Sequence, residues 1–121
     1  MKNLRRKLGN IRPSWRAVIM LWKEEFSFRF QVYCACLTLI LSFVLNISKI
    51  EFLIVLLMIG TVFAVEALNT AIEELCDHVT PHEHPHIGKI KDLGSGASLL
   101  IGVAAILVGL LIFIPHVATF L

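Results

Sequence analysis

The chain has 121 residues and a mass of 13.6 kDa, which is enough for one compact unit. Because 57% of its residues are apolar, 17% are charged and the mean hydropathy is +0.81, the composition excludes an ordinary soluble domain. Residues 1–25 carry seven basic and two acidic side chains, a net charge of +5, whereas residues 93–121 contain no Asp, Glu, Lys or Arg. This distribution is typical of a membrane protein with a basic amino-terminal end.

Residues 1–25 show the pattern of an amphipathic helix. Apolar side chains recur at intervals of three and four positions, with basic residues mostly between them. These apolar positions are Leu4, Leu8, Ile11, Trp15, Val18 and Trp22. We expect the segment to lie at the membrane surface, bent or restarted at Pro13, with both Trp rings at the level of the lipid headgroups. A basic membrane anchor without a further role is the alternative.

Three apolar segments follow, and each is long enough to cross a hydrocarbon core of about 30 Å, which takes about 20 helical residues. They comprise residues 26–45, residues 52–71 with a cytoplasmic extension to about residue 80, and residues 93–120. A tight turn at residues 46–51 joins the first two. The predicted fold is therefore an all-α integral membrane protein, a single membrane domain over residues 1–121 with one amphipathic surface helix and three transmembrane helices.

Basic residues accumulate on the cytoplasmic side of short membrane-flanking segments, and this rule gives the predicted orientation. The amino-terminal charge places residues 1–25 in the cytoplasm. Two crossings bring the polar residues 73–92 back to the same side, while residues 46–51 and the carboxyl terminus face outward. Every cluster of charge is then cytoplasmic.

The second apolar segment carries the polar chemistry. At roughly 100° per helical residue, one stripe of the helix holds Glu66, Asn69, Thr70, Glu73 and Asp77. Glu66 would lie about five residues inside the cytoplasmic boundary, where a carboxylate that faces the protein interior is a functional candidate. Hydrogen bonding between helices is the alternative, and it would account for one Asn. Three carboxylates repel one another unless a cation joins them, and Mg²⁺ held together with nucleotide phosphates suits that need.

A polar loop, HEHPHIG at residues 82–88, follows the second helix. His82, Glu83 and His84 lie in it beside prolines, and we expect the loop to be flexible and to touch a soluble ligand. A zinc site is the alternative, but histidines at alternate positions match no standard zinc spacing and no Cys pair accompanies them.

The run KIKDLGSGASLL at residues 89–100 leads into the third apolar segment. One helical face is shared by Lys91, Ser95, Ser98 and Gly102, so that a cation and two hydroxyls could line up opposite the carboxylate stripe. Lys91 suits a phosphate because its ammonium is a compact charge with three donors. The glycines of this segment are explained by close helix packing. Neither a P-loop nor a protein-kinase glycine loop occurs, so any ATP would be bound in another way.

Four runs of residues together resemble the prokaryotic diacylglycerol kinase family of small integral membrane lipid kinases. They are EEFSFRFQ at residues 24–31, VEALNTAIEELCDHVT at residues 65–80, HEHP at residues 82–85 and KDLGSGASLL at residues 91–100. The resemblance implies a homotrimeric helical bundle in the cytoplasmic (inner) membrane, with composite active sites between subunits. It also implies transfer of the γ-phosphate of MgATP to a lipid alcohol, so that Mg²⁺ is the expected cofactor and ATP the expected phosphate donor.

The same resemblance implies roles by position. Glu66 corresponds to the catalytic base beside the lipid hydroxyl, and Ser95 corresponds to a position near the lipid. Glu25 and Glu73 correspond to the magnesium ligands. The positions around the nucleotide are Glu25, Asn69, Glu73, Asp77, His82, Glu83, His84, Lys91 and Asp92.

The predicted function is therefore that of a lipid kinase that converts diacylglycerol to phosphatidic acid, with an undecaprenol kinase of the same family as the alternative. Residues 28–31 look closer to the undecaprenol branch, whereas Trp15 and Trp22 look closer to the diacylglycerol branch. A small multidrug transporter is a remote alternative, since it would also use one intramembrane Glu, but it needs four spans. The expected partners are ATP, a lipid alcohol, the bilayer and further copies of the chain, and not nucleic acid.

Overall fold

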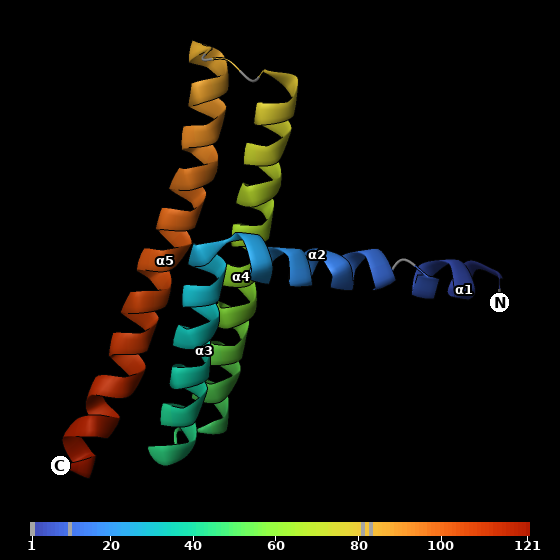
Figure 1. Ribbon diagram of the computed structural model, residues 1–121. Coiled ribbons are helices and arrows are strands. Elements are labelled where there is room, and N and C mark those ends of the chain that lie inside the picture. The colour runs from blue at the N-terminus through green and yellow to red at the C-terminus, as the bar shows by residue number, and fades with distance from the viewer. Residues whose placement is uncertain (1, 10, 81, 83) are drawn as a thin grey trace. The chain divides into compact units, whose positions relative to one another are not determined.

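The computed structural model describes residues 2–9, 11–80, 82 and 84–121. Within these residues all regular secondary structure is helical (Figure 1). The five helices are α1 (Lys2–Gly9), α2 (Ile11–Glu24), α3 (Phe26–Val44), α4 (Lys49–Val79) and α5 (Pro85–Phe120). The chain divides into two compact units, Met1–Cys34 and Ala35–Leu121.

Among the described residues, α3, α4 and α5 are long and apolar enough to cross a membrane, with 19, 31 and 36 residues. The prediction of an all-helical membrane protein with three such helices is confirmed. At 1.5 Å per residue α4 extends about 46 Å and α5 about 54 Å, both well beyond a hydrocarbon core of about 30 Å. Part of each of these two helices therefore extends beyond the hydrocarbon core.

Helix α4 begins at Lys49, earlier than the predicted start at Phe52, because Ser48 and Glu51 form a capping box. The Ser48 hydroxyl accepts a hydrogen bond from the Glu51 backbone N–H at 3.1 Å, and Glu51 Oε1 accepts one from the Ser48 N–H at 3.0 Å. Asn46 has a φ of 52°, a left-handed conformation that Asn tolerates better than most residues, and it turns the chain out of α3. The predicted tight turn is thus shorter than expected.

Helix α5 begins at Pro85, well before the predicted start of the third apolar segment at residue 93. Proline is tolerated in the first turn of a helix, where its missing N–H has no intrahelical acceptor. The His84 ring accepts a hydrogen bond from the His86 N–H at 3.2 Å and caps the helix. The prediction of a flexible loop is therefore wrong for residues 85–88, which are helical, and the connection between α4 and α5 is short.

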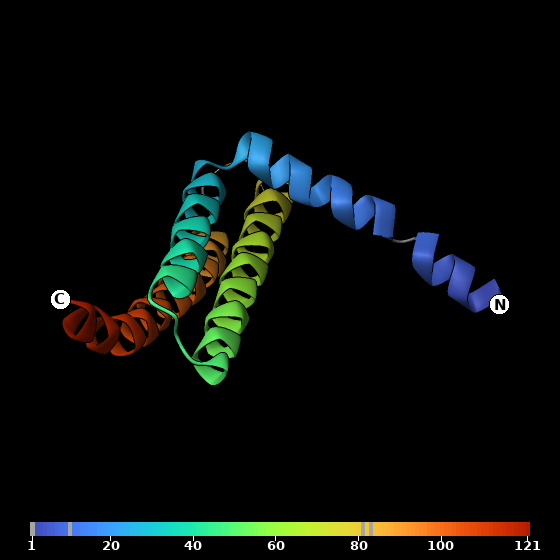
Figure 2. The same ribbon diagram turned by 90° about the horizontal axis from the view of Figure 1, so that it is seen from below.

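Helices α4 and α5 run antiparallel, side by side, and make the principal helix–helix contact of the unit Ala35–Leu121 (Figure 1 and Figure 2). At the end away from their connection, His116 Nε2 lies 2.9 Å and 3.2 Å from the two carboxylate oxygens of Glu51. Both side chains are less than one-third exposed. At the same end of α4 the Phe52 ring packs against Phe43 of α3, with ring centroids 5.6 Å apart. These contacts fix the beginning of α4 against its neighbours.

In the unit Met1–Cys34, the end of α2 is held by side chains of α3. Arg29 Nη1 donates hydrogen bonds to the backbone oxygens of Trp22 at 2.8 Å and Lys23 at 3.0 Å. These carbonyls belong to the last turn of α2, where no intrahelical N–H reaches them. The Trp22 ring also meets the Tyr33 ring edge-on, with centroids 5.8 Å apart. Arg29, which interrupts the first apolar segment of the sequence, thus has a structural role.

We expect removal of the Glu51 side chain to destabilise the fold more than removal of the His116 side chain. His116→Ala removes the hydrogen bond between helices, which should lower the free energy of unfolding by about 1 kcal/mol. Glu51→Ala removes the same bond and the capping box, which should lower the free energy of unfolding further. Glu51→Gln is the control, because Gln also serves at this capping position. The measurement is reversible unfolding in mixed micelles, and equal losses for the two Ala variants would contradict these roles.

Candidate active site

The polar stripe of α4 runs from the exposed end of the helix toward its middle. Asp77 is exposed, Glu73 is partly buried and Glu66 is only 6% exposed, so the burial of the carboxylates increases away from the α4–α5 connection. Along the helix axis Glu73 lies about 9 Å and Glu66 about 20 Å from the last residue of α4. One helix face therefore offers carboxylates at several depths.

Asn69 and Glu73, one helical turn apart on this stripe, touch each other. Asn69 Nδ2 donates a hydrogen bond to Glu73 Oε1 at 3.4 Å, which is long for such a bond. On α5, Gly94 is buried at this level and Ser98 follows it one turn later. Among the described residues, Asn69 Oδ1 and Ser98 Oγ are buried polar atoms without a hydrogen-bond partner. The contact between α4 and α5 is thus polar along part of the stripe.

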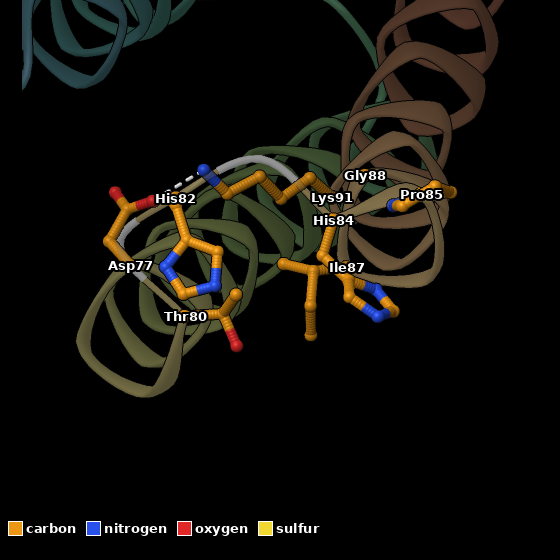
Figure 3. Close-up of a pocket in the computed structure, with 8 residues that line it drawn as sticks. All are labelled: Asp77, Thr80, His82, His84, Pro85, Ile87, Gly88 and Lys91. Atoms are coloured by element: carbon orange, nitrogen blue, oxygen red, sulfur yellow. Dashed lines mark hydrogen bonds and ion pairs between the residues drawn. The ribbon is translucent and has the colours of Figure 1, made fainter.

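A pocket of about 590 Å³ lies where α4 and α5 are connected (Figure 3). Its lining residues are Asp77, Thr80, His82, His84, Pro85, Ile87, Gly88 and Lys91. The volume falls within the range of about 300–1,000 Å³ that small-molecule sites have in proteins. An ammonium group and two imidazole rings among the lining side chains suit a soluble anionic ligand.

Lys91 crosses the pocket from α5 and forms an ion pair with Asp77 of α4, as Figure 3 shows. The Lys91 side chain is 39% exposed and the Asp77 side chain 65% exposed, so water screens the pair strongly. Such an exposed pair stabilises a protein by about 1 kcal/mol or less. Little energy is therefore needed to separate the Lys91 ammonium from the Asp77 carboxylate.

The remaining predicted site residues are distributed over both compact units. Glu25, partly buried, follows α2 in the unit Met1–Cys34, whereas Glu73 belongs to the other unit. A metal site that these two residues share stays a prediction. Asp92 and Ser95 are exposed on α5. Glu83 lies outside the described residues.

The described residues contain no group of three or more His, Cys, Asp or Glu side chains that could hold a metal ion by itself. A structural zinc site needs such a cluster, whereas Mg²⁺ is usually bound by one or two carboxylates together with substrate phosphates and waters. Glu73 lies one helical turn from Asp77 at the pocket, and its partly buried carboxylate fits the second arrangement.

The family model described as prokaryotic diacylglycerol kinase matches residues 12–113. The chain belongs to this family. It is 41% identical to an undecaprenol kinase of Bacillus subtilis over 93 residues, which cover 77% of the chain and 76% of that protein. It is 30% identical to a diacylglycerol kinase of Haemophilus influenzae, over 82% of the chain and 83% of that protein. A diacylglycerol kinase of Escherichia coli is 27% identical, over 85% of the chain and 84% of that protein.

The family membership confirms the resemblance seen in the sequence, and with it the prediction that the chain is an enzyme of a lipid kinase family. The kinase family implies ATP-dependent phosphotransfer. Together with the three apolar helices, it makes the chain a membrane-embedded kinase. A multidrug transporter, the remote alternative, does not fit this membership.

Thr80 lines the pocket and Gly94 lies close to Asn69 of the stripe, although the sequence pattern singles out neither residue as part of a site. Gly94 lies three residues after Lys91 and thus on the same side of α5, a spacing that could have indicated it. Thr80 directly follows α4 and lines the pocket because the connection to α5 is short. Ser95, which the helical projection places beside Lys91, is exposed in the single chain, and its predicted place near the lipid stays a prediction.

Lys91→Met should weaken the use of ATP. Loss of the ammonium is expected to raise the KM for ATP by about tenfold or more, since a charge-assisted hydrogen bond contributes about 1.5–3 kcal/mol. Lys89→Met is the matched control, because Lys89 is exposed nearby on α5 and does not line the pocket. The measurement is the initial rate against ATP concentration at saturating lipid. Equal effects of the two substitutions on the KM for ATP would show that Lys91 does not bind the nucleotide.

Proposed function

We propose that the chain transfers the γ-phosphate of ATP to the hydroxyl group of a membrane lipid along the polar stripe of α4. The observation that carries this proposal is the burial gradient of the stripe, from exposed Asp77 at the pocket to buried Glu66. A nucleotide stays in water and a lipid alcohol stays in the bilayer. Their reacting groups can meet only on a surface that joins both environments, and the stripe is such a surface.

In the proposed reaction the lipid oxygen forms a bond to the γ-phosphorus, the bond from that phosphorus to the bridging oxygen of ATP breaks, and ADP leaves. The hydroxyl proton passes to the carboxylate of Glu66, which acts as the catalytic base. Lys91 releases Asp77 and binds a phosphate, so that its charge offsets the charge of the nucleotide. Phosphoryl transfer depends on positioning and on neutralisation of charge more than on covalent help, and these residues supply both.

Glu73 and Glu25 are the proposed ligands of Mg²⁺. Glu73 supports this role because its carboxylate is a hard oxygen donor and because Asn69 holds one of its oxygens. When bound, Mg²⁺ would neutralise charge on the β- and γ-phosphates. Around the nucleotide we assign, in addition, Asn69, Asp77, His82, Glu83, His84, Lys91 and Asp92, and near the lipid we assign Ser95.

Undecaprenol is the substrate that we favour. The 41% identity to an undecaprenol kinase exceeds the 30% and 27% identities to the two diacylglycerol kinases. Residues 28–31 also look closer to the undecaprenol branch. Diacylglycerol, the substrate predicted first from the sequence, is the second candidate, because the matching family is described by that name. Both lipids are alcohols, so the chemistry proposed for Glu66 is the same for either.

Purified protein in lipid vesicles with radiolabelled ATP will distinguish the two substrates. Undecaprenol, diacylglycerol and no added lipid are compared at equal mole fraction. We expect the label to enter undecaprenyl phosphate at least about tenfold faster than phosphatidic acid. Faster labelling of phosphatidic acid would establish the second candidate instead. Turnover of ATP that does not depend on a lipid alcohol would contradict the kinase proposal itself.

We also propose a homotrimer in the cytoplasmic membrane, with the amino terminus in the cytoplasm, the carboxyl terminus outside, and α1 and α2 on the membrane surface. The net charge of +5 in residues 1–25 supports this orientation. Large apolar side chains of α5 that stay exposed in the single chain, such as Leu99, Leu100 and Leu111, support burial in lipid or against further copies. In a trimer, Glu25 and Glu73 could meet from different subunits.

Substitutions of Glu66 and Glu73 on the stripe are expected to impair activity in different ways. Glu66→Gln keeps the size of the side chain but removes the base, so turnover should fall about 100-fold or more while the KM for ATP changes little. Glu73→Gln should instead raise the Mg²⁺ concentration for half-maximal rate by about tenfold, because a neutral amide replaces an anionic ligand. Glu74→Gln, exposed at the edge of the stripe, is the control. Turnover of Glu66→Gln within about tenfold of the parent would reduce Glu66 to a packing residue.

A further inference from the structure

Gly94 of α5 lies close to Asn69 on the polar stripe of α4. A Cβ atom added at Gly94 would lie 2.5 Å from Asn69 Oδ1, 3.6 Å from Asn69 Cγ and 3.7 Å from Ile72 Cδ1. At each other glycine of the chain, including Gly96 and Gly102 on the same helix, an added Cβ would meet no atom within 4 Å. Close packing within the single chain therefore explains Gly94, whereas packing of the other glycines of this segment against further copies stays a prediction.

The orientation of the Asn69 amide is determined by Glu73. An ionised carboxylate can only accept hydrogen bonds, so the amide nitrogen must face Glu73 Oε1, to which Nδ2 donates at 3.4 Å. The amide oxygen then points the other way, toward Gly94, and it is buried without a hydrogen-bond partner. Rotation of the Asn69 amide by a half-turn would bring its oxygen against the Glu73 carboxylate oxygen, and both atoms are hydrogen-bond acceptors. Asn69 can therefore contact Glu73 in this way only while the space over Gly94 stays open.

We propose that Gly94 is a positioning residue for phosphoryl transfer: the missing side chain lets Asn69 hold the Glu73 carboxylate in the orientation that receives the divalent cation. This inference rests on the proposed role of Glu73 as a magnesium ligand. Residues that orient a metal ligand through a hydrogen bond typically change metal affinity by 10- to 100-fold when they are removed. Gly94 acts one step further away, because it controls the residue that makes the hydrogen bond.

A methyl group at residue 94 should displace Asn69 without unfolding the protein. The atom that it meets first is the end of an Asn side chain, which can rotate away, and the contact with Ile72 would be an ordinary one. Ala also has a higher helix propensity than Gly, which offsets part of any strain. The rotation would remove the hydrogen bond from Asn69 to Glu73.

The test compares Gly94→Ala with Gly96→Ala, Asn69→Ala and the double variant Gly94→Ala/Asn69→Ala. Binding of Mn²⁺ in the presence of a non-hydrolysable ATP analogue is measured by electron paramagnetic resonance, and thermal unfolding is followed without metal. We expect Gly94→Ala to weaken Mn²⁺ binding by about tenfold. Gly96→Ala adds the same methyl group to the same helix in open space and should leave binding unchanged. The double variant should bind Mn²⁺ as Asn69→Ala does, since the methyl group no longer has an amide to displace.

Several outcomes would overturn the inference. Unchanged Mn²⁺ affinity in a folded Gly94→Ala variant, with or without a lower melting temperature, would reduce Gly94 to a helix-spacing residue. If Gly94→Ala does not fold, Asn69→Ala is used in its place. Unchanged Mn²⁺ affinity of Asn69→Ala would show that Asn69 does not orient Glu73 for the cation, which also overturns the inference. If the parent protein binds Mn²⁺ with the analogue and phosphorylates lipid, and Gly94→Ala binds Mn²⁺ equally well, the inference about Gly94 is refuted while the proposed function stands. A parent that phosphorylates no lipid alcohol refutes the proposed function.

Discussion

Burial of the Glu66 carboxylate within a membrane-length helix is the constraint on which the rest of the arrangement depends. A carboxylate in the hydrocarbon region costs about 3 kcal/mol on insertion scales unless it faces a polar interior, so α4 must turn this side away from lipid. The same side carries Asn69, Glu73 and Asp77 toward water. Helix α5 covers it with a glycine at Asn69 and a lysine at Asp77.

The two ends of the α4–α5 pair are joined by side-chain contacts of different character. The pair of His116 with Glu51 is less than one-third exposed, and Glu51 also caps α4, so this contact is part of the fold. The pair of Lys91 with Asp77 is well exposed and borders the pocket. Exposed pairs contribute little to stability and exchange partners readily. One end of the helix pair is therefore held firmly, whereas the contact at the other end can break at little cost.

The number of membrane-length helices and the polar face of α4 were predictable from sequence, because span length and a helical repeat are strong signals. The starts of α4 and α5 were less predictable. The capping box before α4 is a short pattern of four residues within a segment that otherwise looks like a turn. The polar residues around Pro85 look like a loop, although Pro is also favoured in the first turn of a helix. The distinct role of Gly94 depends on the register between two helices, which no single-helix pattern contains. Contact between Glu25 and Glu73 likewise depends on how two separate units, or two subunits, come together.

The position of the divalent cation is the most direct test of the claim that the stripe of α4 joins nucleotide to lipid. Mn²⁺ can replace Mg²⁺ and is visible by anomalous X-ray scattering in crystals of the protein with a non-hydrolysable ATP analogue. The proposed site predicts an anomalous peak about 2 Å from a Glu73 carboxylate oxygen, shared with the phosphates of the analogue. A peak that is coordinated by phosphates and by residues other than those of α4 would contradict it.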